Sequence, residues 1–542
     1  MVQLGFTLCL TAVAYASAAL AKCVPVPPAS PPVDCNGKTY TYNSLAGFGA
    51  IPSDARDQFG DTISTGSSLS IKNWKKDGKK YTGTMYGLPD RGWNTKGTQN
   101  TIPRVHIYDI TFTPSPAASV AKPSGPNIKF AYKKTILLTD PRGTPLTGLD
   151  PDFTASGGLT FPGFPVMPTS TYPGDGFGGA GPGGKRICLD AEAIFLADDG
   201  AFWISDEYGP FVYKFDKDGK MLAAIQPPDA LLPVRKGAVS YNSNTPPIYN
   251  ATQIPVPGDP DHGRQNNQGF EGLTVSPDGK TLFVMLQSAA RQEGGASSSK
   301  RRNTRFLKYS ITKDSKPRIT YEAEWVIPLP TFKNAAGNTR VAAQSEIHYV
   351  SDTQFLVLPR DSSAGRGQAD PLSRYRHVDV VDVSAATNIK GAKFDDIKNG
   401  NITSGGIENP SDTLVSGITP AVLCPFLDYN LNEQLNKFTA SDGTAVRNGP
   451  LASDPTNHGL GLLNEKWEAL ALVPVNDVVR GADSKDEYYL FTLSDNDFIT
   501  NKGFINFGRL PYTDDTATVP FLENQALVFK ITLPKGSKPL VA

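Results

Sequence analysis

The sequence predicts an all-β fold, namely a β-propeller of five to six blades with long loop insertions. Apolar residues occur in short runs of about five to eight, bounded by Asp-Gly, Pro or Asn turns, as strands are. A strand that opens with Glu recurs along the chain, each time followed by a turn and a strand with a polar end. The chain also has 51 Gly and 45 Pro among 542 residues, which disfavours a helical bundle.

The charge composition excludes some classes of partner. The chain has 53 Lys and Arg against 53 Asp and Glu, so its formal net charge is zero. Proteins that bind nucleic acid or anionic membranes carry basic patches, so neither partner is expected here. We expect a monomer that acts on an anionic small molecule.

The N-terminus has the pattern of a secretory signal. Residues 1–21 contain no Asp, Glu, Lys or Arg, and they end in small residues suited to cleavage, such as Ala19-Leu20-Ala21. A Cys- and Pro-rich N-terminal segment over 22–38 follows, and residues 39–542 are then expected to form a single propeller domain. The protein is therefore predicted to be secreted and extracellular.

Cysteine usage fits secretion. Removal of the signal takes away Cys9 and leaves Cys23, Cys35, Cys188 and Cys424, an even number that suggests two disulfides. Three pairings are possible, and we favour Cys23–Cys35 as a local clip and Cys188–Cys424 by elimination.

Two N-glycosylation sequons begin at Asn250 and Asn401. Glycans attach at the surface of secreted proteins, so both loops are predicted to be exposed and glycosylated.

The repeats set the order of the strands. Four units open at Asp190, Phe270, Ser345 and Trp467, and an earlier unit without the Glu begins near Leu69. Five modules are clear and a sixth is not excluded. The segment Thr39–Pro52 could add a strand to the last blade and close the ring, which would leave no open edge. One helix is considered, over Leu427–Phe438.

The repeated Glu and the repeated polar strand ends are expected to meet at one mouth of the central channel, because the start of one hairpin strand lies beside the end of the other. Converging carboxylates repel each other unless some are protonated or a cation neutralises them. Oxygen ligands favour Ca²⁺ over zinc or copper. The predicted metal ligands are Glu192, Asp206, Glu271, Glu346, Glu468, Asp495 and Asp497. In the alternative reading, these Glu residues only hydrogen-bond the backbone of neighbouring blades.

Arginines at the same strand ends suit an anionic substrate, because a guanidinium can hold two oxygens at once. The predicted catalytic set is Glu192, Glu271, Glu468, Asp206, Arg91 and Arg360. The loop over Asp259–Asn267 lies just before Glu271 in the chain, so it could overhang the mouth. The predicted substrate-binding residues are Glu207, His262, Arg264, Asn267 and Asn496.

Several stretches resemble the secreted phytase-like family, often described as "esterase-like activity of phytase". They are YGLPDRGWN (86–94), DAEAIFLADDGAFWISDEYGPFVYKFDKDG (190–219), NQGFEGLTVSPDGKTLFVMLQSA (267–289) and KWEALALVPV with YYLFTLSDNDF (466–498). The resemblance implies a β-propeller that hydrolyses phosphate esters such as phytate. By position it carries over Glu192, Asp206, Glu207, Glu271, Glu468, Asp495, Asn496 and Asp497. The third repeat departs from the pattern at Ser345-Glu346-Ile347.

The leading hypothesis is therefore a secreted, Ca²⁺-dependent phosphoric ester hydrolase that acts at the mouth of the channel. One alternative is a metal-dependent lactonase or related ester hydrolase, since propellers with carboxylate-bound metals also suit that chemistry. A non-catalytic extracellular binding propeller is the other.

Overall fold

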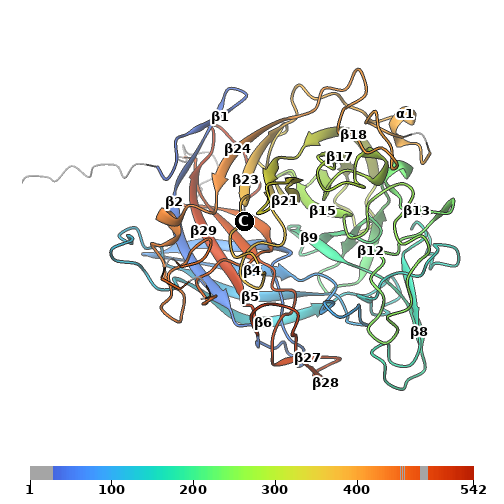
Figure 1. Cartoon of the computed structure of the whole chain (residues 1–542), viewed down its shortest axis with the longest axis horizontal. Coiled ribbons are helices and arrows are strands. Elements are labelled where there is room, and N and C mark those ends of the chain that lie inside the picture. The colour runs from blue at the N-terminus through green and yellow to red at the C-terminus, as the bar shows by residue number, and fades with distance from the viewer. Residues whose placement is uncertain are drawn as a thin grey trace, which may run out of the picture.

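The computed structural model is a five-bladed β-propeller (Figure 1). It describes residues 28–541, except 399, 452, 455, 457 and 477–485. The predicted signal and Cys23 therefore lie outside the described residues. Helix is limited to the four-residue segments α1 (Ala392–Asp395) and α2 (Asn432–Leu435) and to two 3₁₀ turns, η1 (Asp229–Leu231) and η2 (Arg291–Glu293), in the described part of the chain. None of these described helices is long and apolar enough to span a bilayer.

Each blade is an antiparallel sheet, and in blades 1 to 4 the first strand along the chain lies innermost. Blade 1 comprises β3 (Ser68–Asp77), β4 (Lys80–Leu88), β5 (Arg104–Phe112) and β6 (Ile128–Leu137). Blade 2 comprises β9 (Ala191–Leu196), β10 (Phe202–Asp206), β11 (Val212–Phe215) and β12 (Met221–Ile225). Blade 3 comprises β15 (Phe270–Val275), β16 (Thr281–Leu286), β17 (Asn303–Ile311) and β18 (Ile319–Pro328). Blade 4 comprises β21 (Ala343–Tyr349), β22 (Gln354–Arg360), β23 (His377–Asp382) and β24 (Val422–Asp428).

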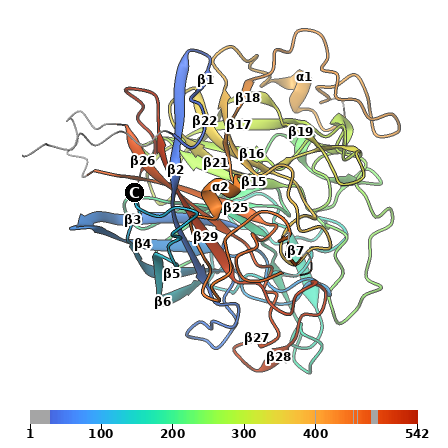
Figure 2. The same cartoon turned by 60° about the vertical axis from the view of Figure 1, so that its left-hand side comes forward.

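Blade 5 joins the two ends of the chain. Its sheet has the order β1 (Val33–Cys35), β2 (Lys38–Ile51), β29 (Asn524–Thr532), β26 (Glu487–Ser494) and β25 (Trp467–Pro474). The pairing of β2 with β29 runs from Thr41↔Thr532 to Ile51↔Asn524, and Figure 2 shows the two strands side by side. The prediction that an N-terminal strand closes the ring is therefore confirmed, and the blade number is five.

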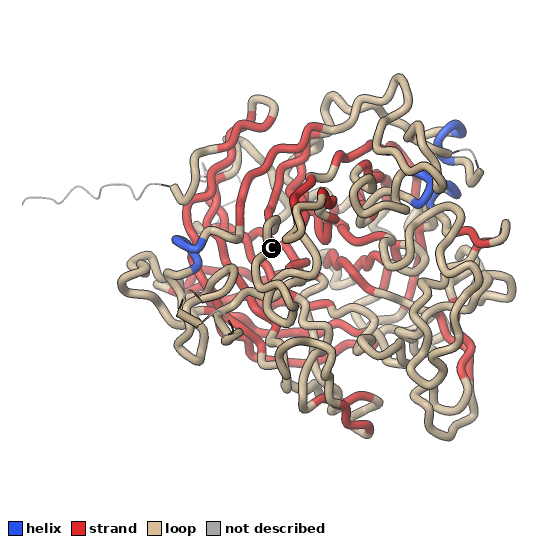
Figure 3. The backbone as a smooth tube through the Cα atoms, in the orientation of Figure 1, coloured by secondary structure: helices blue, strands red, loops and turns tan. Residues whose placement is uncertain are grey.

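Four small hairpins lie outside the blades. They are β7 (Thr169–Tyr172) with β8 (Gly184–Ile187), β13 (Val234–Arg235) with β14 (Ala238–Val239), β19 (Thr331–Lys333) with β20 (Thr339–Val341), and β27 (Gly503–Ile505) with β28 (Leu510–Tyr512). Figure 3 shows long loops around the strands, which is where much of the Gly and Pro is used.

The core is divided into five main apolar clusters, each shared by two neighbouring blades. Between blades 5 and 1, for example, Phe491 packs with Tyr81 and Phe112. Because both faces of each blade are covered by a neighbour, the strands are buried almost continuously, as in β15 and β10. In a ring of blades, each twisted sheet packs against the sheets of two neighbouring blades, so burial on both faces is expected.

The expected helix over Leu427–Phe438 is largely wrong. Strand β24 runs to Asp428, and only the four residues of α2 are helical. The apolar residues of this segment, including Leu427 and Phe438, instead join the cluster between blades 4 and 5. Tertiary packing overrides the local pattern here.

The predicted disulfide pairing is also wrong. The structure bonds Cys35 to Cys424, with their Cα atoms 5.8 Å apart, and leaves Cys188 as a buried free thiol. Ring closure is the reason, because it places β1 at the outer edge of blade 5, beside β24 at the outer edge of blade 4. The bond therefore joins two blades and spans 389 residues of sequence.

We expect the Cys424→Ser variant to be less stable by roughly 2–4 kcal/mol, because a long loop in the unfolded chain is no longer constrained. The measurement is denaturant unfolding of the purified variant beside the parent protein. Ser351→Ala, in the turn between β21 and β22 of the same blade, serves as control. An unchanged midpoint for Cys424→Ser would contradict the assigned pairing.

Candidate functional site

The register of the inner hairpins brings the repeated polar residues to one end of the channel. Ser68 pairs with Leu88, Ala191 with Asp206, Trp467 with Ser494 and Ala343 with Arg360, so in each blade the first strand starts where the second strand ends. We call this end the acidic mouth. The sequence prediction of a shared mouth rests on this same hairpin geometry.

A first group of carboxylates at the acidic mouth comes from blade 2. Oxygen atoms of Asp190, Glu192 and Glu207 lie within 4.8 Å of one another, and all three residues are buried. The Nη1 atom of Arg91 lies 2.9 Å from Oδ2 of Asp190 and forms an ion pair with it. Oε1 of Glu207 is buried without a hydrogen-bond partner among the described residues.

A second group surrounds a lysine of blade 5. Oxygen atoms of Asp90, Asp495 and Asp497 lie within 4.8 Å of one another. The Lys466 ammonium donates to Oδ2 of Asp495 at 3.1 Å and to Oδ1 of Asp497 at 2.7 Å. This group holds Lys466 within hydrogen-bond distance of two of its carboxylates, whereas the first group has one ion pair, between Arg91 and Asp190, with Arg264 and Lys466 acting on Glu207 electrostatically.

Two further glutamates connect these groups. Glu468 forms an ion pair with Arg360, and its Oε2 lies 3.8 Å from the Lys466 ammonium. Glu271 accepts a hydrogen bond from Gln287 at Oε1, and its Oε2 is buried without a partner among the described residues. Glu271 interacts electrostatically with Glu207 and Glu468.

The mouth therefore concentrates negative charge in a buried place. Its eight carboxylates belong to Asp90, Asp190, Glu192, Glu207, Glu271, Glu468, Asp495 and Asp497, and its three cations to Arg91, Arg360 and Lys466. Burial, and then repulsion by neighbouring carboxylates, raises the pKa of Glu192 well above its ordinary value. Burial first, with Glu207 and Glu468 next, does the same to the pKa of Glu271. A site of this kind gains free energy from a proton or a cation.

Two predicted site residues are engaged in holding local structure. Asp206 accepts hydrogen bonds from the backbone N–H groups of Asp190, Tyr208 and Gly209 and from the hydroxyl of Tyr213. Burial raises the pKa of Asp206 to about 7. Asn496 accepts from Ser64 and donates to the Leu522 carbonyl, and it is fully buried. Both side chains have their polar atoms used inside the fold.

The loop over Asp259–Asn267 contributes less to the mouth than the sequence suggested. Arg264 is fully buried and donates to the carbonyl oxygens of Tyr208 and Tyr241. His262 pairs with Val234 through its backbone carbonyl, and Asn267 is exposed with a positive φ of 51°. Arg264 therefore fixes the segment after β10 rather than presenting a free guanidinium.

Sequence reasoning left Asp190 and Lys466 out of the predicted site and did not choose Asp90 as a ligand. Asp190 and Lys466 each stand two residues before a repeated Glu, at Asp190-Ala-Glu192 and Lys466-Trp-Glu468. In a strand, residues two apart share a face, so a charged residue two positions before Glu192 and Glu468 was the available signal.

Glu346 lies deeper in the channel and bonds to neighbouring blades. Its Oε2 accepts from the hydroxyl of Ser68 at 2.6 Å, and its Oε1 accepts from the backbone N–H groups of Leu273 and Ile347 at 3.1 and 2.9 Å. Ser68 in turn accepts from the N–H of Ile194 at 3.1 Å. We call this set the Glu346 bridge, and it joins the inner strands of blades 1, 2, 3 and 4. For Glu346, these contacts match the alternative hypothesis from the sequence, in which a repeated Glu hydrogen-bonds the backbone of a neighbouring blade.

We expect Glu346→Ala to lower stability by about 2–4 kcal/mol, because it leaves two buried N–H groups and a hydroxyl without partners. Glu346→Gln keeps an oxygen for both N–H groups and should recover most of that loss. Thermal unfolding measures both variants, with Glu322→Gln as control, since Glu322 also accepts from a serine but is exposed. Equal stability of Glu346→Ala and the parent would contradict the role of the bridge.

The chain is similar to several known proteins. A secreted protein of Arthroderma benhamiae, described as uncharacterized, is 47% identical over 479 residues, which cover 86% of this chain and 89% of the relative. Among solved structures, the catalytic domain of the Coprinopsis cinerea GH62 α-L-arabinofuranosidase covers 90% of this chain and 97% of its own at 9% identity, with a TM-score of 0.27. A GH62 hydrolase in complex with xylotriose gives 0.29 at 9% identity, with the same coverage of both chains.

The family model for phytase-like proteins, described as "Esterase-like activity of phytase", matches residues 78–498. That range includes four of the five inner hairpins and the whole of both carboxylate groups. By this match and by its relative, the chain belongs to the phytase-like family.

Proposed function

We propose that this protein is a secreted, metal-dependent phosphoric ester hydrolase that acts at the acidic mouth. Family membership and the fold support a hydrolase of the propeller type. The observation that carries the finer proposal is a pair of buried oxygens without hydrogen-bond partners among the described residues, Oε1 of Glu207 and Oε2 of Glu271. Arg91 and Lys466 act electrostatically on Glu207, and Arg360 acts on Glu271. An extracellular location is supported by the secreted relative and by the Cys35–Cys424 bond.

The first carboxylate group fits a Ca²⁺ ion. Its donors are all oxygens, which hard cations prefer, and the one ion pair that its three carboxylates form within the described residues is that of Asp190 with Arg91. Asp190, Glu192 and Glu207 would hold the ion. When bound, Ca²⁺ would neutralise these carboxylates and polarise the oxygens of a phosphate group. A metal ion would stabilise the group of Asp90, Asp495 and Asp497 less, because the Lys466 ammonium already forms ion pairs with Asp495 and Asp497.

The cations of the mouth would recognise the anionic substrate. Arg360 and Lys466 both form ion pairs with Glu468. A phosphate bound next to this carboxylate would therefore contact both cations. An arginine can donate two parallel hydrogen bonds to phosphate oxygens. The substrate class that follows is a small phosphate ester.

Glu271 suits the transfer of a proton to the leaving alcohol. Gln287 fixes its Oε1, and its Oε2 is free of protein partners among the described residues. Burial raises the pKa of Glu271 well above that of a free glutamate, so the carboxyl can stay protonated at a pH where a free one would not. In hydrolysis, the oxygen of a water molecule adds to phosphorus and the bond from phosphorus to the alkoxide breaks, and the Glu271 proton would pass to that alkoxide and release it as the alcohol.

We expect Glu192→Gln to lose bound calcium and phosphatase turnover together, because a neutral amide replaces a charged ligand, while the protein stays folded. Calcium is measured by elemental analysis after gel filtration. Turnover is measured with phytate and with p-nitrophenyl phosphate, with and without chelator. Asp218→Asn is the control, since its carboxylate is 72% exposed on a distant turn. Full calcium and full turnover in Glu192→Gln would remove the proposed centre.

The same assay separates the alternatives. Turnover of a lactone but of neither phosphate ester would support the lactonase reading. Bound calcium with no turnover of any ester would support a binding propeller.

We expect Arg360→Lys to raise KM for p-nitrophenyl phosphate by about tenfold with a smaller change in kcat, because lysine keeps the charge but loses the two-pronged contact. Arg374→Lys serves as control, since Arg374 pairs with Asp370 in the loop before β23. An equal KM in Arg360→Lys and the parent would show that Arg360 does not bind the substrate.

A further inference from the structure

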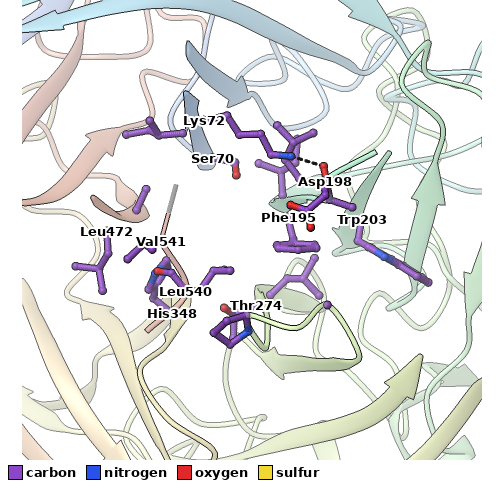
Figure 4. Close-up of a pocket in the computed structure, with 18 of the residues that line it drawn as sticks. Ser70, Lys72, Phe195, Asp198, Trp203, Thr274, His348, Leu472, Leu540 and Val541 are labelled. Atoms are coloured by element: carbon purple, nitrogen blue, oxygen red, sulfur yellow. Dashed lines mark hydrogen bonds between the residues drawn. The ribbon is translucent and has the colours of Figure 1, made fainter. Parts of the chain in front are cut away.

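The opposite end of the channel contains a cavity of about 840 Å³, which we call the lower chamber. Its upper wall is apolar and comes from the inner strands, with Leu69, Ile194, Leu273 and Leu470 from blades 1, 2, 3 and 5. Cavities of about 300–1,000 Å³ are the usual size for small-molecule sites. Figure 4 shows side chains from several blades around this space.

The Glu346 bridge lies between the lower chamber and the acidic mouth. Glu346 lines the chamber, and both of its oxygens accept hydrogen bonds from other blades. The inner end of the chamber therefore presents no free charge. An apolar group placed there would be removed from water without leaving a polar group unpaired.

Two lysines at the outer rim donate their hydrogen bonds to neutral carbonyl oxygens, while Asp198 and Asp199 near Lys72 and Asp199 and Asp314 near Lys214 act on them electrostatically. The Lys72 ammonium donates to the carbonyl of Ala197, and the Lys214 ammonium donates to the carbonyl of Asp314 at 2.6 Å. Neither lysine has a salt bridge within the described residues. Burial lowers the pKa of both, although Asp199 opposes this in each. An anion placed beside a partly buried ammonium group stabilises its positive charge.

The rim is otherwise mixed. Asp198, Asp199 and Asp278 also line it, with Lys313 and the indole of Trp203, whose ring centre lies 5.8 Å from the Lys214 ammonium. Leu540 and Val541 complete one side, where Leu540 donates to the Tyr349 carbonyl and its own carbonyl lies 2.8 Å from Nε2 of His348 (Figure 4). The chamber thus combines a deep apolar wall with cations near its opening.

We propose that the lower chamber binds an amphipathic carboxylate with a single apolar chain. The chain would lie against Leu69, Ile194 and Leu470, and the carboxylate would lie beside Lys72 and Lys214. This site is distinct from the acidic mouth and does not depend on the phosphatase proposal.

The probe is laurate, added to the full-length protein and followed by calorimetry and by the change in tryptophan fluorescence, to which Trp203 contributes. We expect one laurate per chain and at least tenfold weaker binding in Lys72→Gln. Lys75→Gln, an exposed lysine on the same strand, should bind as the parent does. Leu472→Trp fills the chamber and should abolish binding, with its fold checked by near-UV circular dichroism.

Three results would overturn the proposal: no binding of laurate to the parent, equal binding by Lys72→Gln, or binding of dodecanol as tight as that of laurate. Turnover at the acidic mouth should be the same in Lys72→Gln as in the parent, so failure of either proposal is seen without the other. If Leu472→Trp does not fold, Lys72→Gln alone decides the outcome.

Discussion

The antiparallel pairing of β2 with β29 is the constraint on which the rest of the structure depends. It completes blade 5 from the two ends of the chain and holds five inner strands in a closed ring. Only in a closed ring do carboxylates from blades 1, 2, 3 and 5 face one another across one mouth. The same closure gives each blade a neighbour on both faces, so the apolar clusters between blades are shared all the way round. Closure of the ring thus accounts both for the packing between blades and for the concentration of carboxylates at the acidic mouth.

The channel is divided by its own hydrogen bonds. Above the Glu346 bridge, buried carboxylates outnumber the cations and two oxygens have no partner among the described residues. Below it, the wall formed by the inner strands is apolar, and the rim carries both lysines and aspartates. Glutamates at equivalent positions of the repeat therefore have different roles. Glu192 and Glu271 keep oxygens available, whereas Glu346 uses both of its own to join blades.

The fold and the mouth could be predicted from the sequence because both follow from local rules. A repeated strand–turn–strand unit predicts a propeller, and hairpin pairing places Glu192 beside the end of β10. Side-chain direction could not be predicted in the same way. Asp206 and Asn496 follow strands as expected, yet backbone N–H groups of their own turns or nearby loops use their oxygens. The disulfide was missed because Cys35 and Cys424 meet only through ring closure, which spacing along the chain does not encode.

The buried thiol of Cys188 constrains the order in which this chain can mature. Cys188 is made long before Cys424, and Cys35 must wait for that late partner across almost the whole domain. In an oxidising compartment two waiting thiols would combine if both stayed accessible. Blade 2, whose apolar cluster adjoins Cys188 at Ile187 and Leu189, encloses this sulfur in the folded protein. Packing of the second blade before Cys424 is made would thus keep Cys188 from competing for Cys35.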